Sequence, residues 1–134
     1  MITVSTIIKA PIYKVWEYWN SPAHIKNWYF ASSDWHVPEA ENSLKVGGRF
    51  KINMAAKDKS ASFDFEGIYT EIFDFKKINY YIIDGRLVEV AFLEHQNFVT
   101  ISQHFEPESE NPVDMQQAGW QAILDNFKQY VEEN

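Results

Sequence analysis

The stretch PVDMQQAGWQAILDNFKQYVE, from Pro112 to Glu132, decides the fold. Apolar side chains recur in it every three to four residues, as on one face of an α-helix, and polar side chains occupy the other face. The apolar face holds Gly119, Trp120, Ile123, Leu124, Phe127, Tyr130 and Val131, and the polar face holds Gln117, Gln121, Asp125 and Lys128. A long helix with one broad apolar face must lie across another apolar surface.

The rest of the chain supplies that surface as a predicted antiparallel sheet. Strands are expected where β-branched or alternating apolar residues recur, at 2–8, 47–54, 62–73, 77–83, 86–94 and 97–106, with a less defined one near 34–38. Asp84-Gly85 is the strongest hairpin signal. Two short helices are expected after the first strand, one after Pro11 and one after Ser21-Pro22, where Ser21 is the predicted N-cap. We therefore predict an α+β fold with about six to seven strands around the C-terminal helix.

Composition limits the cellular setting and the partners. The 134 residues suit one domain, residues 1–134, and 46% of them are hydrophobic, enough for a core. The net charge of −7 disfavours nucleic acid and anionic membranes as partners. There is no cysteine, and the N-terminus does not have the pattern of a signal peptide. No stretch reaches the length of a membrane span, so we expect a cytoplasmic protein.

Local motifs, in order along nearly the whole chain, resemble those of one family. They are Ile8-Lys9-Ala10-Pro11 with Val15-Trp16, Ser21-Pro22 with Ile25 and Trp28, Gly47-Gly48-Arg49-Phe50, Gly67 to Ile72, and Gly119-Trp120 with Leu124 and Tyr130. The family is the activator-of-Hsp90-ATPase-homologue type of the START-like (SRPBCC) superfamily. One departure is the turn Phe73-Asp74-Phe75-Lys76-Lys77, where the family commonly has proline.

The resemblance implies the helix-grip fold, in which a curved sheet grips the long helix around a cavity. Relatives of this type include co-chaperone domains that stimulate Hsp90, which would link the chain to the stress response, and the superfamily includes lipid carriers and polyketide cyclases. Because these uses share a fold, the resemblance transfers the cavity and little more.

Aromatic side chains on the predicted inner faces are candidates for a ligand pocket between the sheet and the helix. The alternative is an ordinary aromatic core. The candidates are Phe50, Phe63, Phe65, Tyr69, Phe92, Trp120 and Phe127.

His104 is the one histidine with a candidate pocket role. Alternation places it with Phe98, Thr100 and Ser102 on one face of a strand, and Val99, Ile101, Gln103 and Phe105 lie on the other. If the first face is concave, His104 is a polar pocket residue, acting either as a hydrogen-bond partner or as a general base. Glu71 falls on the Phe65/Tyr69 face and could also point inward.

Other chemistry has no motif to support it. The four histidines show no metal-ligand spacing, and neither a nucleophile elbow nor a glycine-rich phosphate loop is present. We therefore expect no metal, no cofactor and no catalytic residue.

Three functions remain open. Binding of a small apolar or aromatic molecule is favoured, and it predicts a cavity with few titratable groups. A protein-interaction or chaperone-regulator module predicts an exposed apolar patch, for which Tyr29-Phe30 and Phe73/Phe75 are candidates. A cyclase or hydrolase predicts a buried titratable group that faces the cavity. The oligomeric state stays open between monomer and homodimer, because an edge strand such as 2–8 could pair across a dimer.

Overall fold

The computed structural model describes all 134 residues, which form one antiparallel sheet and three helices. The strands are β1 (Ile2–Ile8), β2 (Trp35–His36), β3 (Ala40–Asn42), β4 (Arg49–Ala56), β5 (Ser62–Phe73), β6 (Lys77–Ile82), β7 (Leu87–Glu94) and β8 (Val99–Phe105). The helices are α1 (Ile12–Asn20), α2 (Pro22–Ile25) and α3 (Val113–Glu133). No helix is both long enough and apolar enough to cross a membrane.

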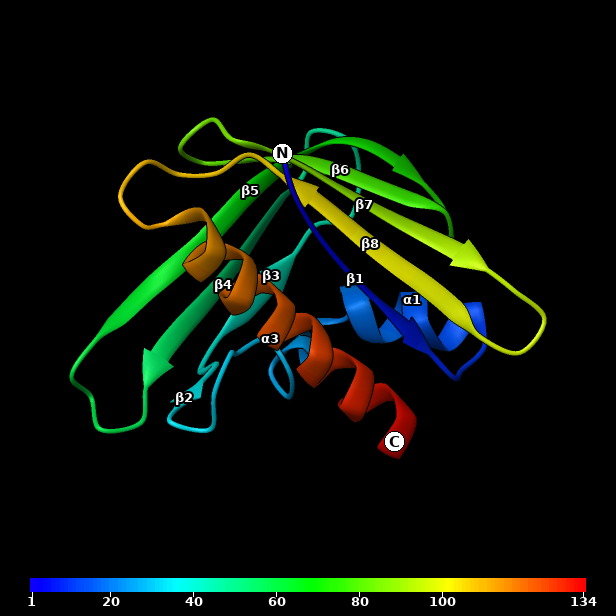
Figure 1. The fold of residues 1–134 in the computed structure, drawn as a ribbon, viewed down its shortest axis with the longest axis horizontal. Coiled ribbons are helices and arrows are strands. Elements are labelled where there is room, and N and C mark those ends of the chain that lie inside the picture. The colour runs from blue at the N-terminus through cyan, green and yellow to red at the C-terminus, as the bar shows by residue number, and fades with distance from the viewer.

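The sheet runs in the order β1-β8-β7-β6-β5-β4-β2, and β3 pairs with β4 off this path. It has eight strands, more than the expected six to seven, because the short strands β2 and β3 both join β4. Figure 1 shows the sheet curving around α3, with α1 near the C-terminal end of that helix. The predicted α+β helix-grip arrangement is thus confirmed.

The concave face of the sheet and the apolar face of α3 share one core. Inward side chains of β4 to β8 meet the buried Leu124, Phe127 and Val131 of α3. Trp28, which follows α2 and is fully buried, packs edge-on against Phe127 with ring centroids 4.5 Å apart. Ser21 does precede α2 as predicted, but its side chain makes no capping hydrogen bond.

Polar side chains of α3 fasten the helix to the free edge of β1. The amides of Gln117 and Gln121 donate to the carbonyl oxygens of Thr3 and Ser5, each at 3.0 Å. Further along, the Lys128 ammonium donates to the carbonyl oxygen of Ile7 at 2.5 Å. Backbone groups at a sheet edge are otherwise open to pairing with another strand. These bonds occupy the β1 edge, one of the places where a dimer could have formed.

Glu132, one helical turn after Lys128 on α3, continues this attachment. Its carboxylate accepts hydrogen bonds from the backbone N–H of Lys9 at 2.9 Å and from the Lys128 ammonium at 2.8 Å. These two donors, Lys128 first, hold the pKa of Glu132 below its usual value. The polar face of α3 therefore continues its contact with the edge of the sheet past the end of β1.

Glycine at position 67 allows two aromatic rings, Phe50 and Tyr80, to meet on the concave face. A Cβ at Gly67 would overlap the Phe50 ring and lie 3.1 Å from Cδ2 of Tyr80. Phe50 and Tyr80 pack edge-on with centroids 4.8 Å apart. Any side chain at position 67 would therefore have to displace the Phe50 ring.

We predict that Gly67→Ala lowers the free energy of unfolding by about 1–3 kcal/mol, the usual cost of overpacking a well-filled core. Chemical denaturation monitored by circular dichroism measures it. Gly119→Ala is the matched control, because a Cβ there meets no atom within 4 Å. In a helix interior that change should add roughly 0.5–1 kcal/mol. Equal effects at the two positions would contradict the packing described here.

Candidate functional site

A cavity of about 520 Å³ lies beneath the N-terminal half of α3. Its walls come from α3, from the ends of β4 and β5 that lie nearest their connecting turn, and from the segment that follows α2. Most of the lining residues are hydrophobic, 11 of 18. They are Trp19, Tyr29, Phe30, Ala31, Ser32, Trp35, Met54, Phe63, Phe65, Arg86, Gln103, Glu108, Asn111, Met115, Gln116, Gly119, Trp120 and Ile123. The volume and the apolar lining are typical of a site for a small molecule.

The helix side of the cavity combines a gap with an aromatic wall. Gly119 leaves open space where any other residue would project a side chain. Trp120, beside it, stacks on Phe105 of β8 with centroids 3.8 Å apart and rings 11° from parallel. The Trp120 ring also meets Phe65 of β5 edge-on at 6.0 Å. This packing fixes the indole in place, so the wall is formed before any ligand arrives.

Gln103 of β8 is the one buried polar side chain on the inner wall whose amide has no hydrogen-bond partner within the protein. It is 4% exposed and lines the cavity. Gln116, also buried, is different: its amide bonds the backbone of Glu108 and Asn111 at 2.8–3.1 Å. Gln116 thus holds a loop in place, whereas the amide of Gln103 is free to meet whatever enters the cavity.

Two charged side chains line the cavity. The Arg86 Nε donates to the Asp84 carboxylate at 2.9 Å, and its Nη1 donates to the carbonyl oxygen of Glu106 at 3.4 Å. The Glu108 carboxylate accepts the backbone N–H groups of Asn111 at 2.7 Å and Glu110 at 3.2 Å. The bond from Asn111, together with that from Glu110, holds the pKa of Glu108 below its usual value. The Glu108 carboxylate therefore stabilises the turn of its own loop through these two hydrogen bonds.

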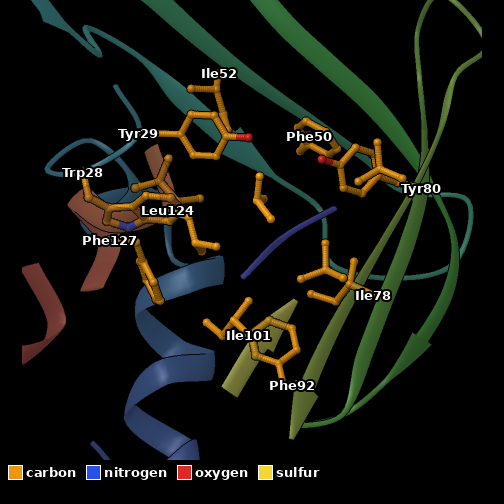
Figure 2. Packing of buried hydrophobic residues seen from close by; sticks show 14 of the residues in the cluster. Trp28, Tyr29, Phe50, Ile52, Ile78, Tyr80, Phe92, Ile101, Leu124 and Phe127 are labelled. Carbon is orange, nitrogen blue, oxygen red and sulfur yellow. The ribbon is translucent and has the colours of Figure 1, made fainter. Parts of the chain in front are cut away.

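Deeper in the fold, three phenols surround a second, much smaller cavity of about 30 Å³. Tyr29 and Trp19 line both cavities and so form the partition between them. Figure 2 shows the hydroxyl ends of Tyr29 and Tyr80 turned toward one another. The third phenol, Tyr69, donates to Oδ1 of Asn42 at 2.5 Å. Asn42 in turn donates to the backbone of α1, at the carbonyl oxygen of Asn20, at 2.8 Å.

Burial is the main cause of a raised pKa at each of these phenols. It raises the pKa of Tyr29, with a further contribution from Tyr69. It raises the pKa of Tyr69 against the opposing effect of the Asn42 hydrogen bond. It raises the pKa of Tyr80 as well, and the neighbouring Tyr29 and Tyr69 add to the shift. All three phenols therefore stay protonated in the folded protein at neutral pH.

The predicted pocket residues fall into three groups. Phe63, Phe65 and Trp120 line the large cavity. Phe50 and Tyr69 line the small one. The remaining pair packs in the core around Trp19: Phe127 meets that indole edge-on at 4.9 Å, and Phe92 meets it edge-on at 5.7 Å. Figure 2 shows Phe92 and Phe127 among the other core side chains.

His104 does not face the cavity, and this corrects the sequence-based hypothesis. The inward face of β8 holds Val99, Ile101, Gln103 and Phe105, all buried. His104 lies on the opposite face, where its Nδ1 is 2.8 Å from Oγ1 of Thr3. The apolar residues decide which face turns inward, so the neighbouring Gln103 takes the inner position. A single polar residue among inward apolar ones was the signal that could have identified Gln103.

Glu71 is also turned outward. A β-bulge between Tyr69 and Glu71 breaks the alternation along β5, so that Ile72 pairs with the buried Ile78 and Glu71 faces the other side. There the Glu71 carboxylate forms an ion pair with Lys77 at 2.6 Å. No group of three or more acidic or histidine side chains converges as a metal site would require.

The segment after α2 contributes several residues that sequence reasoning did not place in the pocket. Tyr29 was expected to be exposed, but it is 9% exposed and lines both cavities. Phe30 and Trp35 also line the large cavity. This segment has no regular period, so no pattern in the sequence could orient its side chains.

Comparison with known proteins gives a family and close structural relatives. The sequence profile of the family described as "Activator of Hsp90 ATPase homolog 1-like protein" matches residues 9–132. The solution structure of an AHSA1-like protein from Aeromonas hydrophila is similar, with 42% identity and a TM-score of 0.91 over 98% of this chain and 93% of that one. A solution structure from Cytophaga hutchinsonii has 51% identity and a TM-score of 0.85 over 99% and 92%.

More distant structures share the fold alone. A protein from Chromobacterium violaceum has 20% identity and a TM-score of 0.80 over 99% of this chain and 97% of that one. No curated protein matches the sequence.

The buried phenols predict a loss of stability in alkali. A tyrosine in the unfolded chain ionises near pH 10, whereas these three stay protonated to higher pH when folded. Their contribution is therefore fully present below about pH 10 and is lost as pH rises toward the raised folded pKa. In that window each phenol lowers the free energy of unfolding by about 1.4 kcal/mol per pH unit.

Denaturant titrations between pH 9 and 11.5 measure this slope. Tyr29→Phe removes one phenol, so the slope of unfolding free energy against pH should become less steep by about 1.4 kcal/mol per pH unit, the contribution of one phenol. Tyr13→Phe is the control, because Tyr13 is 68% exposed. Identical slopes for wild type and Tyr29→Phe would contradict the burial of this phenol.

Proposed function

The chain belongs to the family of activator of Hsp90 ATPase homolog 1-like proteins, and we propose that it binds a small apolar or aromatic molecule in the cavity beneath α3. The fold of this family, consistent with the START-like superfamily, commonly binds hydrophobic ligands or regulates Hsp90. The observation that carries the proposal is the size and lining of the cavity, about 520 Å³ with mainly hydrophobic walls.

Packing energetics support a functional reason for this cavity. Protein interiors are normally packed as densely as organic crystals, with few voids larger than a water molecule. An apolar cavity loses dispersion contacts along its walls and lowers stability. Gly119 adds to that cost, because glycine in a helix interior is less stable than alanine by roughly 1 kcal/mol. Both features remove stability from the free protein, and both make room for a ligand.

The aromatic walls favour a ligand with rings. Indole or phenyl groups reach the cavity from α1, β5, α3 and β2, through Trp19, Phe65, Trp120 and Trp35 respectively. Aromatic pairs prefer edge-to-face or offset-stacked geometries, and several walls at different orientations offer both to one guest.

Catalysis in the same cavity has less support. The titratable side chains of the lining are Tyr29, Arg86 and Glu108. The raised pKa of Tyr29 keeps its phenol protonated, and the Glu108 carboxylate is engaged by its own loop. Neither is poised to remove a proton from a ligand near neutral pH.

The binding proposal predicts that N-phenyl-1-naphthylamine, a neutral fluorescent probe, binds and brightens in the cavity. Gly119→Phe should weaken its binding at least tenfold, because the new ring projects into open space. Thermal melting shows whether the variant still folds, and it should be at least as stable as wild type. At a probe concentration 100 times its Kd, wild type should gain about 2.7 kcal/mol of stability.

Two controls accompany this experiment. Gly119→Ala adds only one methyl group and should keep most of the affinity. Phe73→Ala removes an apolar side chain that is 55% exposed and does not line the cavity, so it should leave the affinity unchanged. If the probe binds Gly119→Phe as tightly as wild type, its site is elsewhere and the proposal is wrong.

Chaperone regulation is the second candidate, because the family is named for an activator of Hsp90. The end of β5 and the turn that follows it support this candidate with two exposed rings, Phe73 at 55% and Phe75 at 44% exposure. Phe75 has a left-handed backbone conformation, φ 66°, and packs on Trp16 at 5.6 Å. This fixes the ring at the surface. Tyr29, the other expected surface aromatic, is buried.

For this candidate, adding the protein should raise the ATPase rate of a purified Hsp90-type chaperone, and Phe73→Ser should lose the effect while still binding the naphthylamine. A chaperone rate that does not respond to wild type would reject the second candidate and leave the first unaffected.

A further inference from the structure

We propose that Gln103 is the polar anchor of the cavity and selects apolar or aromatic ligands that carry a carbonyl-type hydrogen-bond acceptor. This rests on the proposed binding function. The starting observation is that the Gln103 side chain lines the cavity, is 4% exposed, and makes no hydrogen bond within the protein. Its neighbours on the inner face of β8, Ile101 and Phe105, are apolar and fully buried.

The Gln103 amide reaches the space of the cavity, because Oδ1 of Asn79 is the one buried side-chain atom that is sealed off without a hydrogen-bond partner. Polar side chains inside native proteins are nearly always hydrogen-bonded, so a group within the cavity, water or ligand, is the natural partner of this amide. Leucine or methionine would fill the same volume without presenting a polar group to the cavity. Gln116, the other glutamine of the lining, shows the usual solution, because its amide is fully engaged by the 108–111 loop.

The lining also determines which polar group a ligand should carry. The Gln103 amide offers two N–H donors and one acceptor. Arg86, on the same lining, has its Nε and Nη1 committed to Asp84 and Glu106, and its Nη2 makes no bond within the protein. The one carboxylate of the lining, Glu108, accepts N–H bonds from its own loop. N–H donors of Gln103 and Arg86 that are not committed within the protein thus line the cavity, which favours a ligand that accepts hydrogen bonds.

The apolar walls complete the specificity. A ligand that places its carbonyl oxygen at Gln103 can keep its rings against Phe65 and Trp120. A hydrocarbon of the same shape fits the walls but leaves the amide unpaired. Sites built to hydrogen-bond a ligand discriminate against analogues that lack the polar group for this reason. The inferred class is an aromatic or aliphatic molecule with a ketone, ester, amide or carboxylate group.

Two probes of matched shape test the inference: 2-acetylnaphthalene, a ketone, and 2-isopropenylnaphthalene, in which a methylene replaces the oxygen. Their Kd values are measured for wild type, Gln103→Leu and Gln129→Leu by displacement of N-phenyl-1-naphthylamine. The last variant makes the same chemical change on the exposed side of α3. For Gln103→Leu, the ratio of ketone to hydrocarbon affinity should fall about three- to tenfold, the value of one neutral hydrogen bond.

The hydrocarbon should bind Gln103→Leu at least as well as wild type, and the free variant should melt at the same or a higher temperature. An unchanged affinity ratio would overturn the anchor role. An equal loss of both affinities with a lower melting temperature would overturn it too, since Gln103 would then be a structural residue. If wild type binds none of the three probes, the binding function itself fails, and the inference fails with it.

Discussion

The attachment of α3 to the edge strand β1 is the constraint on which the rest of the structure depends. A helix laid on a curved sheet by apolar contacts alone could slide or rotate, because the hydrophobic effect is non-directional. The hydrogen bonds from Gln117, Gln121 and Lys128 to the β1 backbone fix both the position and the rotation of the helix. They also occupy an edge that would otherwise offer unpaired backbone groups to another strand.

With the helix held along one edge, the space beneath it divides into two parts. The C-terminal half is filled, because Leu124, Phe127 and Val131 pack into the core beside Trp28. The N-terminal half stands over β4 and β5, where Gly119 supplies no side chain and the cavity remains. One continuous helix thus has a stabilising half and a half that is available for binding.

The same division separates two kinds of polar group. The phenols of Tyr29, Tyr69 and Tyr80 surround the small inner cavity, where burial keeps them neutral and Asn42 accepts a hydrogen bond from Tyr69. Gln103 lies at the open region and has no partner in the protein. Local sequence pattern and fold are expected to disagree at functional sites, and a glutamine among the inward apolar residues of β8 is a disagreement of this kind.

The sequence by itself determined the order of the elements and the apolar face of α3, because helical and strand periods are local properties of the chain. It also identified Phe63, Phe65 and Trp120 as candidates that do line the cavity. The tertiary structure alone decided which face of β8 turns inward and hence that Gln103, not His104, meets the cavity. It also introduced the bulge that turns Glu71 outward. Both outcomes depend on which neighbouring strands and helix cover each face, and no single segment contains that information.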